Sequence, residues 1–198
     1  MSVQPRRALI GLVALALLLT GCSSDPLAEQ YREGSSKGFI AGDGSWTEIP
    51  VEKRGEPIEF GGTTESGEAV SNADYAGEVL VVNFWYASCA PCRAEAPDLQ
   101  QLSEDFAGKG AEWLGVNVRD QAANAIAFND AFGITYPSVM DVDGGGMQLA
   151  FSGSIPPNAV PTTLVLDRSG RVAARILGQV SSPSILATLI SDTIAEDS

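Results

Sequence analysis

Unbroken apolar runs alternate with helix-like spacing along residues 79–195, which predicts alternating strands and helices. The run 79–85 is almost continuously apolar, as is typical of a strand that is buried on both faces of a sheet. Further apolar runs predict three more strands, at 113–118, 162–166 and 171–177. The turn sequence Asp-Arg-Ser-Gly at 167–170 joins the last two strands, so we expect them to be antiparallel.

Three segments carry apolar residues at the spacing of an α-helix. The first contains Ala96, Leu99, Leu102 and Phe106 and is followed by stop signals at Gly108 and Gly110. The second covers 122–132 and ends at Gly133. The third begins at Ser182-Pro183, where proline suits the first helical turn, and its apolar face is formed by Ile185, Leu186, Leu189, Ile190 and Ile194.

Alternating elements that close with a hairpin and a helix predict an α/β protein with a central mixed sheet flanked by helices. Two short hairpins are expected before this sheet. One joins 39–41 to 46–49 through Gly42-Asp43-Gly44 and is an N-terminal addition to the fold. The other joins 58–60 to 68–70, with Gly61-Gly62 and Gly67 between them.

The N-terminal residues have the pattern of an export signal. Arg6 and Arg7 precede a twelve-residue apolar run that is too short to cross a ~30 Å hydrocarbon core as a helix. The segment ends Leu-Thr-Gly-Cys at Cys22, which resembles the bacterial lipoprotein signal, in which the cysteine is diacylated and becomes the mature N-terminus. An ordinary signal peptide or signal anchor with an incidental cysteine is the alternative.

The expected domain organisation follows from this signal. Residues 1–21 are predicted to be a lipoprotein signal peptide, and residues 22–37 a flexible tether that is anchored by lipid on Cys22. Residues 38–198 are predicted to be the folded domain. We therefore expect the protein to be extracytoplasmic and anchored to the outer face of the cell membrane.

The amino-acid composition excludes several classes of catalytic and binding site. The 198-residue chain contains no histidine, which excludes Ser-His-Asp and Cys-His catalytic pairs and histidine-bound metal or haem sites. A formal net charge of −13 argues against nucleic-acid binding, which needs clustered Lys and Arg. Three cysteines are present, and if Cys22 carries lipid, only Cys89 and Cys92 remain.

The motif Cys89-Ala-Pro-Cys92 follows a buried strand and opens a helix. At this spacing the two sulfurs can form a disulfide without moving the backbone. Because the helix N-terminus stabilises a thiolate, Cys89 is the predicted nucleophile and the exposed member of the pair, and Cys92 resolves the mixed disulfide. A structural disulfide is the alternative, although a four-residue loop gains little stability from one. A zinc site would need four soft ligands.

The stretch Asn-Phe-Trp-Tyr-Ala-Ser-Cys-Ala-Pro-Cys-Arg-Ala-Glu-Ala-Pro at 83–97 resembles the active site of the thioredoxin superfamily. More narrowly, it resembles the membrane-tethered TlpA/ResA-like thiol-disulfide oxidoreductases. Supporting matches occur at 57–60, 75–79, 115–117 and 160–164, so the likeness covers about residues 55–195. The resemblance implies a thioredoxin-like fold.

The same resemblance implies roles for single residues. Pro161 should follow a cis peptide bond and pack beside the cysteine pair, with the backbone of Val160 available to a substrate strand. Glu95, three residues after Cys92, should sit near the pair and help to exchange its protons, and partial shielding from water would raise its pKa. Alternatively, Glu95 only decorates the first turns of the helix. The family usually has tryptophan where this chain has Ser88, which leaves the substrate preference open.

The sequence thus predicts an extracytoplasmic thiol-disulfide oxidoreductase without metal or other cofactor. The resemblance points to a reductant of exported proteins such as apocytochrome c, supplied with electrons by a membrane thiol-disulfide partner. One alternative is an oxidant that introduces disulfides into secreted proteins. Another is a lipoprotein binding module with an inert disulfide. We expect a monomer.

Overall fold

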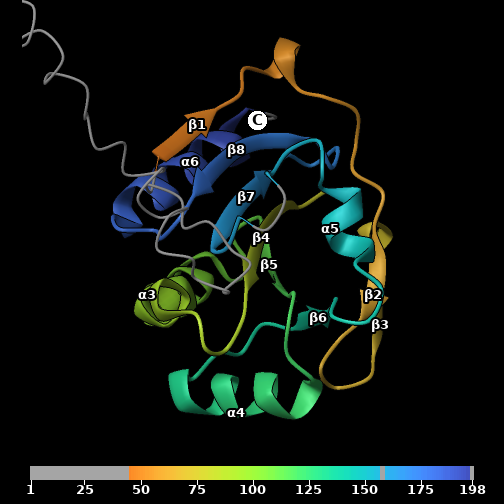
Figure 1. Ribbon diagram of the computed structural model, residues 1–198. Helices are drawn as coiled ribbons and strands as arrows, with labels where there is room; N and C mark the ends of the chain where they lie inside the picture. Colours follow the sequence, from red (N-terminus) through yellow and green to blue (C-terminus); the bar gives the residue numbers. More distant parts are fainter. Residues whose placement is uncertain (1–44, 157–158, 197–198) are drawn as a thin grey trace, which may run out of the picture. The chain divides into compact units, whose positions relative to one another are not determined.

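The computed structural model describes residues 45–156 and 159–196 (Figure 1). Their main sheet has the strand order β1-β8-β7-β4-β5-β6. The strands are β1 (Ser45–Glu48), β4 (Val79–Trp85), β5 (Ala111–Asn117), β6 (Ser138–Met140), β7 (Thr162–Leu166) and β8 (Val172–Leu177). β4, β5 and β6 are parallel to one another. β7 is antiparallel to β4, β8 is antiparallel to β7, and β1 is antiparallel to β8. This is the predicted mixed sheet.

All seven residues of β4 are buried, because the strand lies between β7 and β5 and both of its faces are covered. Leu80, Val82 and Phe84 face one apolar cluster, and Val79 and Val81 face a second cluster on the opposite side. A strand with two buried faces reads as a continuous apolar run, which is why the sequence identified it.

Helices cover both faces of the sheet. The long helix α3 (Ala90–Phe106) and the C-terminal helix α6 (Pro183–Ala195) lie on one side (Figure 1). The short helix α5 (Gly146–Ala150) and the hairpin of β2 (Gly61–Thr63) and β3 (Ala69–Ser71) lie on the other. Helix α4 (Ala122–Phe132) ends at Gly133 with φ of 69°, as predicted. Two 3₁₀ turns, η1 (Val51–Lys53) and η2 (Asn72–Tyr75), complete the described elements.

The predicted hairpins need correction. The segment expected as the second strand of the N-terminal hairpin is β1, which pairs with β8, and residues 39–41 lie outside the described residues. In the other hairpin the prediction that Gly61 and Gly62 form a break was wrong, because both belong to β2. A Cβ on Gly62 would collide with Val139 of β6, so glycine here permits close packing instead of a turn.

Two short elements were not predicted, β6 and α5. A turn that begins after Asp141 joins them. The Asp141 carboxylate caps α5, since Oδ1 accepts from the backbone N of Met147 at 2.8 Å and Oδ2 from that of Gln148 at 3.0 Å.

Trp85, at the end of β4, is held by a contact that requires glycine on β5. Its indole Nε1 donates to Ser138 Oγ on β6 at 3.2 Å, across Gly115 of the intervening strand. A Cβ on Gly115 would collide with Ser138 Oγ and lie 2.9 Å from Trp85 Nε1. The absence of a side chain at this position therefore lets β4 and β6 be joined just below the cysteine motif.

Gly115→Ala should lower the free energy of unfolding by about 1–2 kcal/mol through overpacking and loss of this hydrogen bond. Chemical denaturation followed by tryptophan fluorescence measures the change. Gly144→Ala is the matched control, because nothing lies within 4 Å of a Cβ built there. Equal stability of the two variants would contradict the packing argument.

Candidate active site

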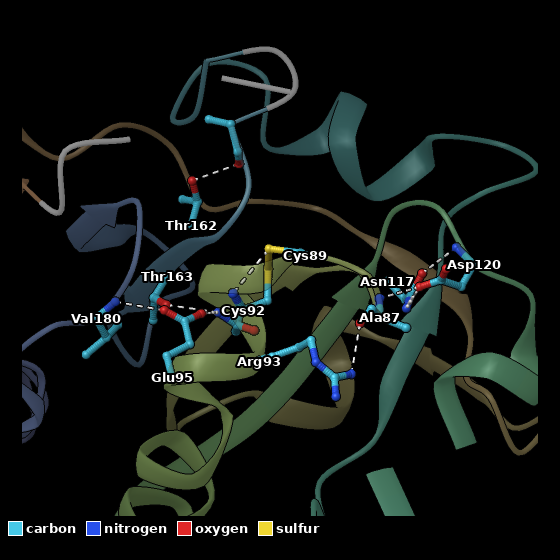
Figure 2. The surroundings of a disulfide bond; sticks show 12 residues. Ala87, Cys89, Cys92, Arg93, Glu95, Asn117, Asp120, Thr162, Thr163 and Val180 are labelled. Atoms are coloured by element: carbon cyan, nitrogen blue, oxygen red, sulfur yellow. Dashed lines mark hydrogen bonds between the residues drawn. A yellow bond between two sulfur atoms is a disulfide. The ribbon is translucent and has the colours of Figure 1, made fainter. Parts of the chain in front are cut away.

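The cysteine motif lies where β4 passes into α3. Cys89 is the N-cap of the helix and Pro91 stands in its first turn, where a missing N–H is not a loss. Cys89 and Cys92 form a disulfide, with their Cα atoms 5.2 Å apart (Figure 2). The backbone N of Cys92 donates to Cys89 Sγ at 3.1 Å. This contact and the helix dipole both favour negative charge on the Cys89 sulfur, as the sequence suggested.

The prediction that Cys89 is exposed was wrong. Its exposed fraction is 2%, the same as that of Cys92. The two cysteines pack in the apolar cluster that contains Tyr86, Ala96 and Val160, which accounts for the burial. A sulfur atom of another molecule could therefore reach Cys89 only after the surrounding side chains had moved.

The Val160–Pro161 peptide bond is cis, as the resemblance implied. Antiparallel pairing sets Thr162, the first residue of β7, opposite Phe84 of β4. Pro161 thus lies at the same edge of the sheet as the cysteine motif. Its carbonyl accepts from the backbone N of Gly178, and Thr162 Oγ1 donates to the carbonyl of Ala159 (Figure 2). A role for Pro161 in substrate binding stays a prediction.

Glu95 lies one helical turn after Cys92 and is buried, with an exposed fraction of 1%. Asn83 Nδ2 of β4 donates to Oε1 at 3.0 Å, and the backbone N of Val180 donates to Oε2 at 2.7 Å. Asn83 Nδ2 also donates to Thr163 Oγ1 at 3.1 Å, so β4, β7 and α3 meet at this carboxylate. The position is more enclosed than the partial shielding that the sequence suggested.

Burial raises the pKa of Glu95, whereas the hydrogen bonds from Val180 and Asn83 lower it. Burial is the larger effect, and the resulting pKa is about 7. The negative charge of Glu95 in turn adds to the burial that raises the pKa of Tyr136. A carboxyl group with a pKa near neutrality can both accept and donate a proton under ordinary conditions. The raised pKa therefore agrees with the predicted proton exchange, and the role itself remains a proposal.

The sequence did not single out the residues that hold the turn before Cys89. Asp120, just beyond the end of β5, accepts from the backbone N of Ala87 and is itself bonded to Asn117, the last residue of β5. Arg93 of α3 donates to the carbonyl of Ala87 (Figure 2). Arg93 and Asn117 lie within the stretches that resemble the family, whereas the only signal for Asp120 was its place just after a predicted strand.

Cys22, the predicted site of lipid attachment, lies outside the described residues. No helix between residues 45 and 196, apart from the two residues left undescribed, is long and apolar enough to cross a membrane. Within the same part of the chain, no cluster of three or more acidic or cysteine side chains could hold a metal ion.

The strand-disulfide-helix unit, the cis proline opposite it and the mixed sheet define a protein of the thioredoxin fold. Residues 55–175 match the model of the AhpC/TSA family. The chain belongs to this family.

Curated relatives agree with this assignment. The chain is 33% identical over 112 residues to the thiol-disulfide oxidoreductase ResA of Geobacillus thermodenitrificans, covering 57% of this chain and 62% of the relative. It is 36% identical over 109 residues to the thiol:disulfide interchange protein HelX of Rhodobacter capsulatus, covering 55% and 57%. The matches thus span about three fifths of the length of these relatives.

Solved structures cover more of the chain. A DsbF homologue from Corynebacterium diphtheriae superimposes with a TM-score of 0.66 at 34% identity, covering 78% of this chain and 97% of the other. A secreted thiol-disulfide isomerase from Corynebacterium glutamicum gives 0.69 at 32% identity, covering 80% and 97%. The similarity therefore extends through 97% of each of these two neighbouring chains.

Proposed function

We propose that this protein is an extracytoplasmic thiol-disulfide oxidoreductase that works through Cys89 and Cys92. The observation that carries the proposal is the disulfide at the N-terminus of α3, where Cys89 Sγ accepts from the backbone N of Cys92. The names of the ResA and HelX relatives and of the two corynebacterial structures support the same chemistry.

In the reducing direction, the Cys89 thiolate attacks one sulfur of a substrate disulfide and forms a mixed disulfide. The other substrate sulfur leaves as a thiolate and takes up a proton. Cys92 then loses its proton and attacks Cys89 Sγ, which releases the second substrate sulfur and restores the Cys89–Cys92 disulfide. Two electrons pass to the substrate, and a membrane dithiol donor must return them. We propose that Glu95, three residues after Cys92 on α3 and with a pKa of about 7, accepts the proton that Cys92 loses.

The proposed substrates are disulfides of exported proteins. The resemblance to TlpA/ResA-like proteins points to apocytochrome c, before haem is attached. Lipid on Cys22 would keep the domain at the outer face of the membrane, close to both the electron donor and newly exported chains. This assignment rests on the sequence motif at Cys22 and on the family resemblance.

A second candidate is a protein that forms or rearranges the disulfides of secreted proteins instead of reducing them. The C. glutamicum neighbour, which is 32% identical and covered over 97% of its length, is described as a secreted isomerase. An isomerase or oxidant would hold Cys89 and Cys92 at a less reducing potential, and the uncharged Ala-Pro pair between them does not select between the two.

The deciding experiment is the reduction potential of the Cys89–Cys92 pair in the full-length protein in detergent. It is measured by equilibration in thiol buffers with tryptophan fluorescence or alkylation as the readout. A value near or below about −220 mV with rapid exchange supports the reductant, and one above about −180 mV supports a disulfide donor. A disulfide that does not exchange with a protein substrate would overturn the enzymatic proposal and favour a binding module.

A further inference from the structure

The turn Tyr86–Cys89 delivers the nucleophile to the N-terminus of α3. The backbone N of Cys89 donates to the carbonyl of Tyr86 at 3.1 Å, which closes the turn. The carbonyl of Cys89 then accepts from the backbone N of Arg93 at 3.0 Å, within the first turn of the helix. The position of Cys89 Sγ therefore depends on both the turn and the helix that follows it.

Side chains from two other elements hold both backbone polar groups of Ala87, the second residue of this turn (Figure 2). Its N donates to Asp120 Oδ2 at 2.6 Å. Its carbonyl accepts from Arg93 Nη1 at 3.3 Å. The first of these is a short hydrogen bond to a charged group on a half-buried residue, whereas the second involves an exposed side chain, so Asp120 provides the stronger restraint.

Asp120 is itself fixed by the end of β5. Asn117 is fully buried, and its Nδ2 donates to Asp120 Oδ2 at 3.0 Å. Asn117 Oδ1 accepts from the backbone N of Asp120 at 2.7 Å and from that of Arg119 at 3.1 Å. The guanidinium of Arg119 stands 5.2 Å from the centre of the Tyr86 ring. The loop after β5 thus holds the first two residues of the turn.

We propose that Asp120 is a positioning residue for thiol-disulfide exchange, which keeps the Cys89 sulfur at the N-terminus of α3 by anchoring Ala87. The inference rests on the proposed function, because it assigns a role within the same reaction. Interactions with a helix terminus fall off within its first turn, so a small displacement of Cys89 reduces the stabilisation of its thiolate. Ser88, the remaining residue of the turn, is exposed, so the contacts that fix the turn are made by Tyr86 and Ala87.

The charge of Asp120 acts in the opposite direction from its hydrogen bond. Two cationic side chains, Arg93 and Arg119, and one anionic side chain, Asp120, contact the turn. The other carboxyl group close in sequence to the cysteines is that of Glu95 on α3. A nearby carboxylate by itself disfavours a thiolate, so removing it raises the reactivity of Cys89 if Asp120 acts only through its charge. Removal lowers the reactivity if Asp120 acts by position.

The test compares Asp120→Ala and Asp120→Asn in the reduced full-length protein. Iodoacetamide alkylation of Cys89 is followed across pH by peptide mass spectrometry, and chemical denaturation gives the stability of each variant. Asp120→Ala should slow alkylation at pH 7 about tenfold and raise the pKa of the Cys89 thiol. Asp120→Asn should retain most of the wild-type rate, because its Oδ1 can accept from both Ala87 and Asn117. Asp98→Ala, an exposed carboxylate on α3, controls for net charge.

Each other outcome has a distinct meaning. Faster alkylation in both Asp120 variants would replace positioning with a purely electrostatic role. Lower stability with an unchanged alkylation profile would make Asp120 merely structural, and either result overturns the inference while leaving the proposed function intact. If Cys89 of the wild-type protein reacts no faster than a free cysteine, the proposed function and the positioning role fail together.

Discussion

Cys92→Ser should trap the protein on its substrate, whereas Cys89→Ser should not react at all. With Cys92 replaced, Cys89 still attacks a substrate disulfide, but no second thiol releases the product, so a mixed disulfide accumulates. With Cys89 replaced, the sulfur at the N-terminus of α3 is absent, and exchange falls on the order of 10³-fold or more, as for enzymes that lose their nucleophile.

Non-reducing electrophoresis and mass spectrometry, with a disulfide-bonded polypeptide as the substrate, measure both results. The full-length chain also contains Cys22. A Cys89→Ser, Cys92→Ser double variant therefore shows any adduct formed at Cys22. Trapping by Cys89→Ser instead of Cys92→Ser would reverse the assigned roles, and trapping by neither would favour an inert disulfide.

The cysteine motif could be predicted from the sequence because its local signals agree. A continuous apolar run gives β4, proline in the first turn and helical spacing give α3, and the motif lies between them. Likewise, α4 has the predicted bounds because Gly133 ends it. In contrast, β6 and α5 contain three and five residues, too few for a periodic pattern to emerge.

Tertiary contacts decided the features that the sequence did not reveal. Cys89 is buried because segments distant in sequence pack around it, including the one that contains Val160. The anchor from Asp120 to Ala87 joins residues 33 positions apart and depends on parallel pairing of β4 with β5. Local propensity carries no information about such contacts.

Glu95 was predicted only in part from the sequence. Its place after Cys92 marked it as a candidate, but its partners come from the pairing of Asn83 with Thr163 and from the segment before α6. Asn83 of β4 serves as a hydrogen-bond donor to this carboxylate on the neighbouring helix.

This buried acid should make the protein less stable as the pH rises toward neutrality. The pKa of Glu95 is about 7 in the folded protein and near 4.5 in the unfolded chain. A raised pKa contributes stability that is complete below the unfolded value and is lost as pH rises through the folded value. Between pH 5 and 8, the oxidised wild-type protein should therefore lose about 2–3 kcal/mol relative to Glu95→Gln, which does not titrate.

Urea denaturation of both oxidised proteins at a series of pH values measures this difference. The quantity compared is the change in the free energy of unfolding with pH. Absolute values are not compared, because glutamine has only one acceptor oxygen for the donors Asn83 and Val180 and the variant therefore has a different stability at every pH. Glu59→Gln, at an exposed carboxylate, should follow the wild-type slope. Parallel slopes for wild type and Glu95→Gln would mean that Glu95 is already ionised at pH 5, and a carboxylate that does not titrate near neutrality could not exchange protons with Cys92 there.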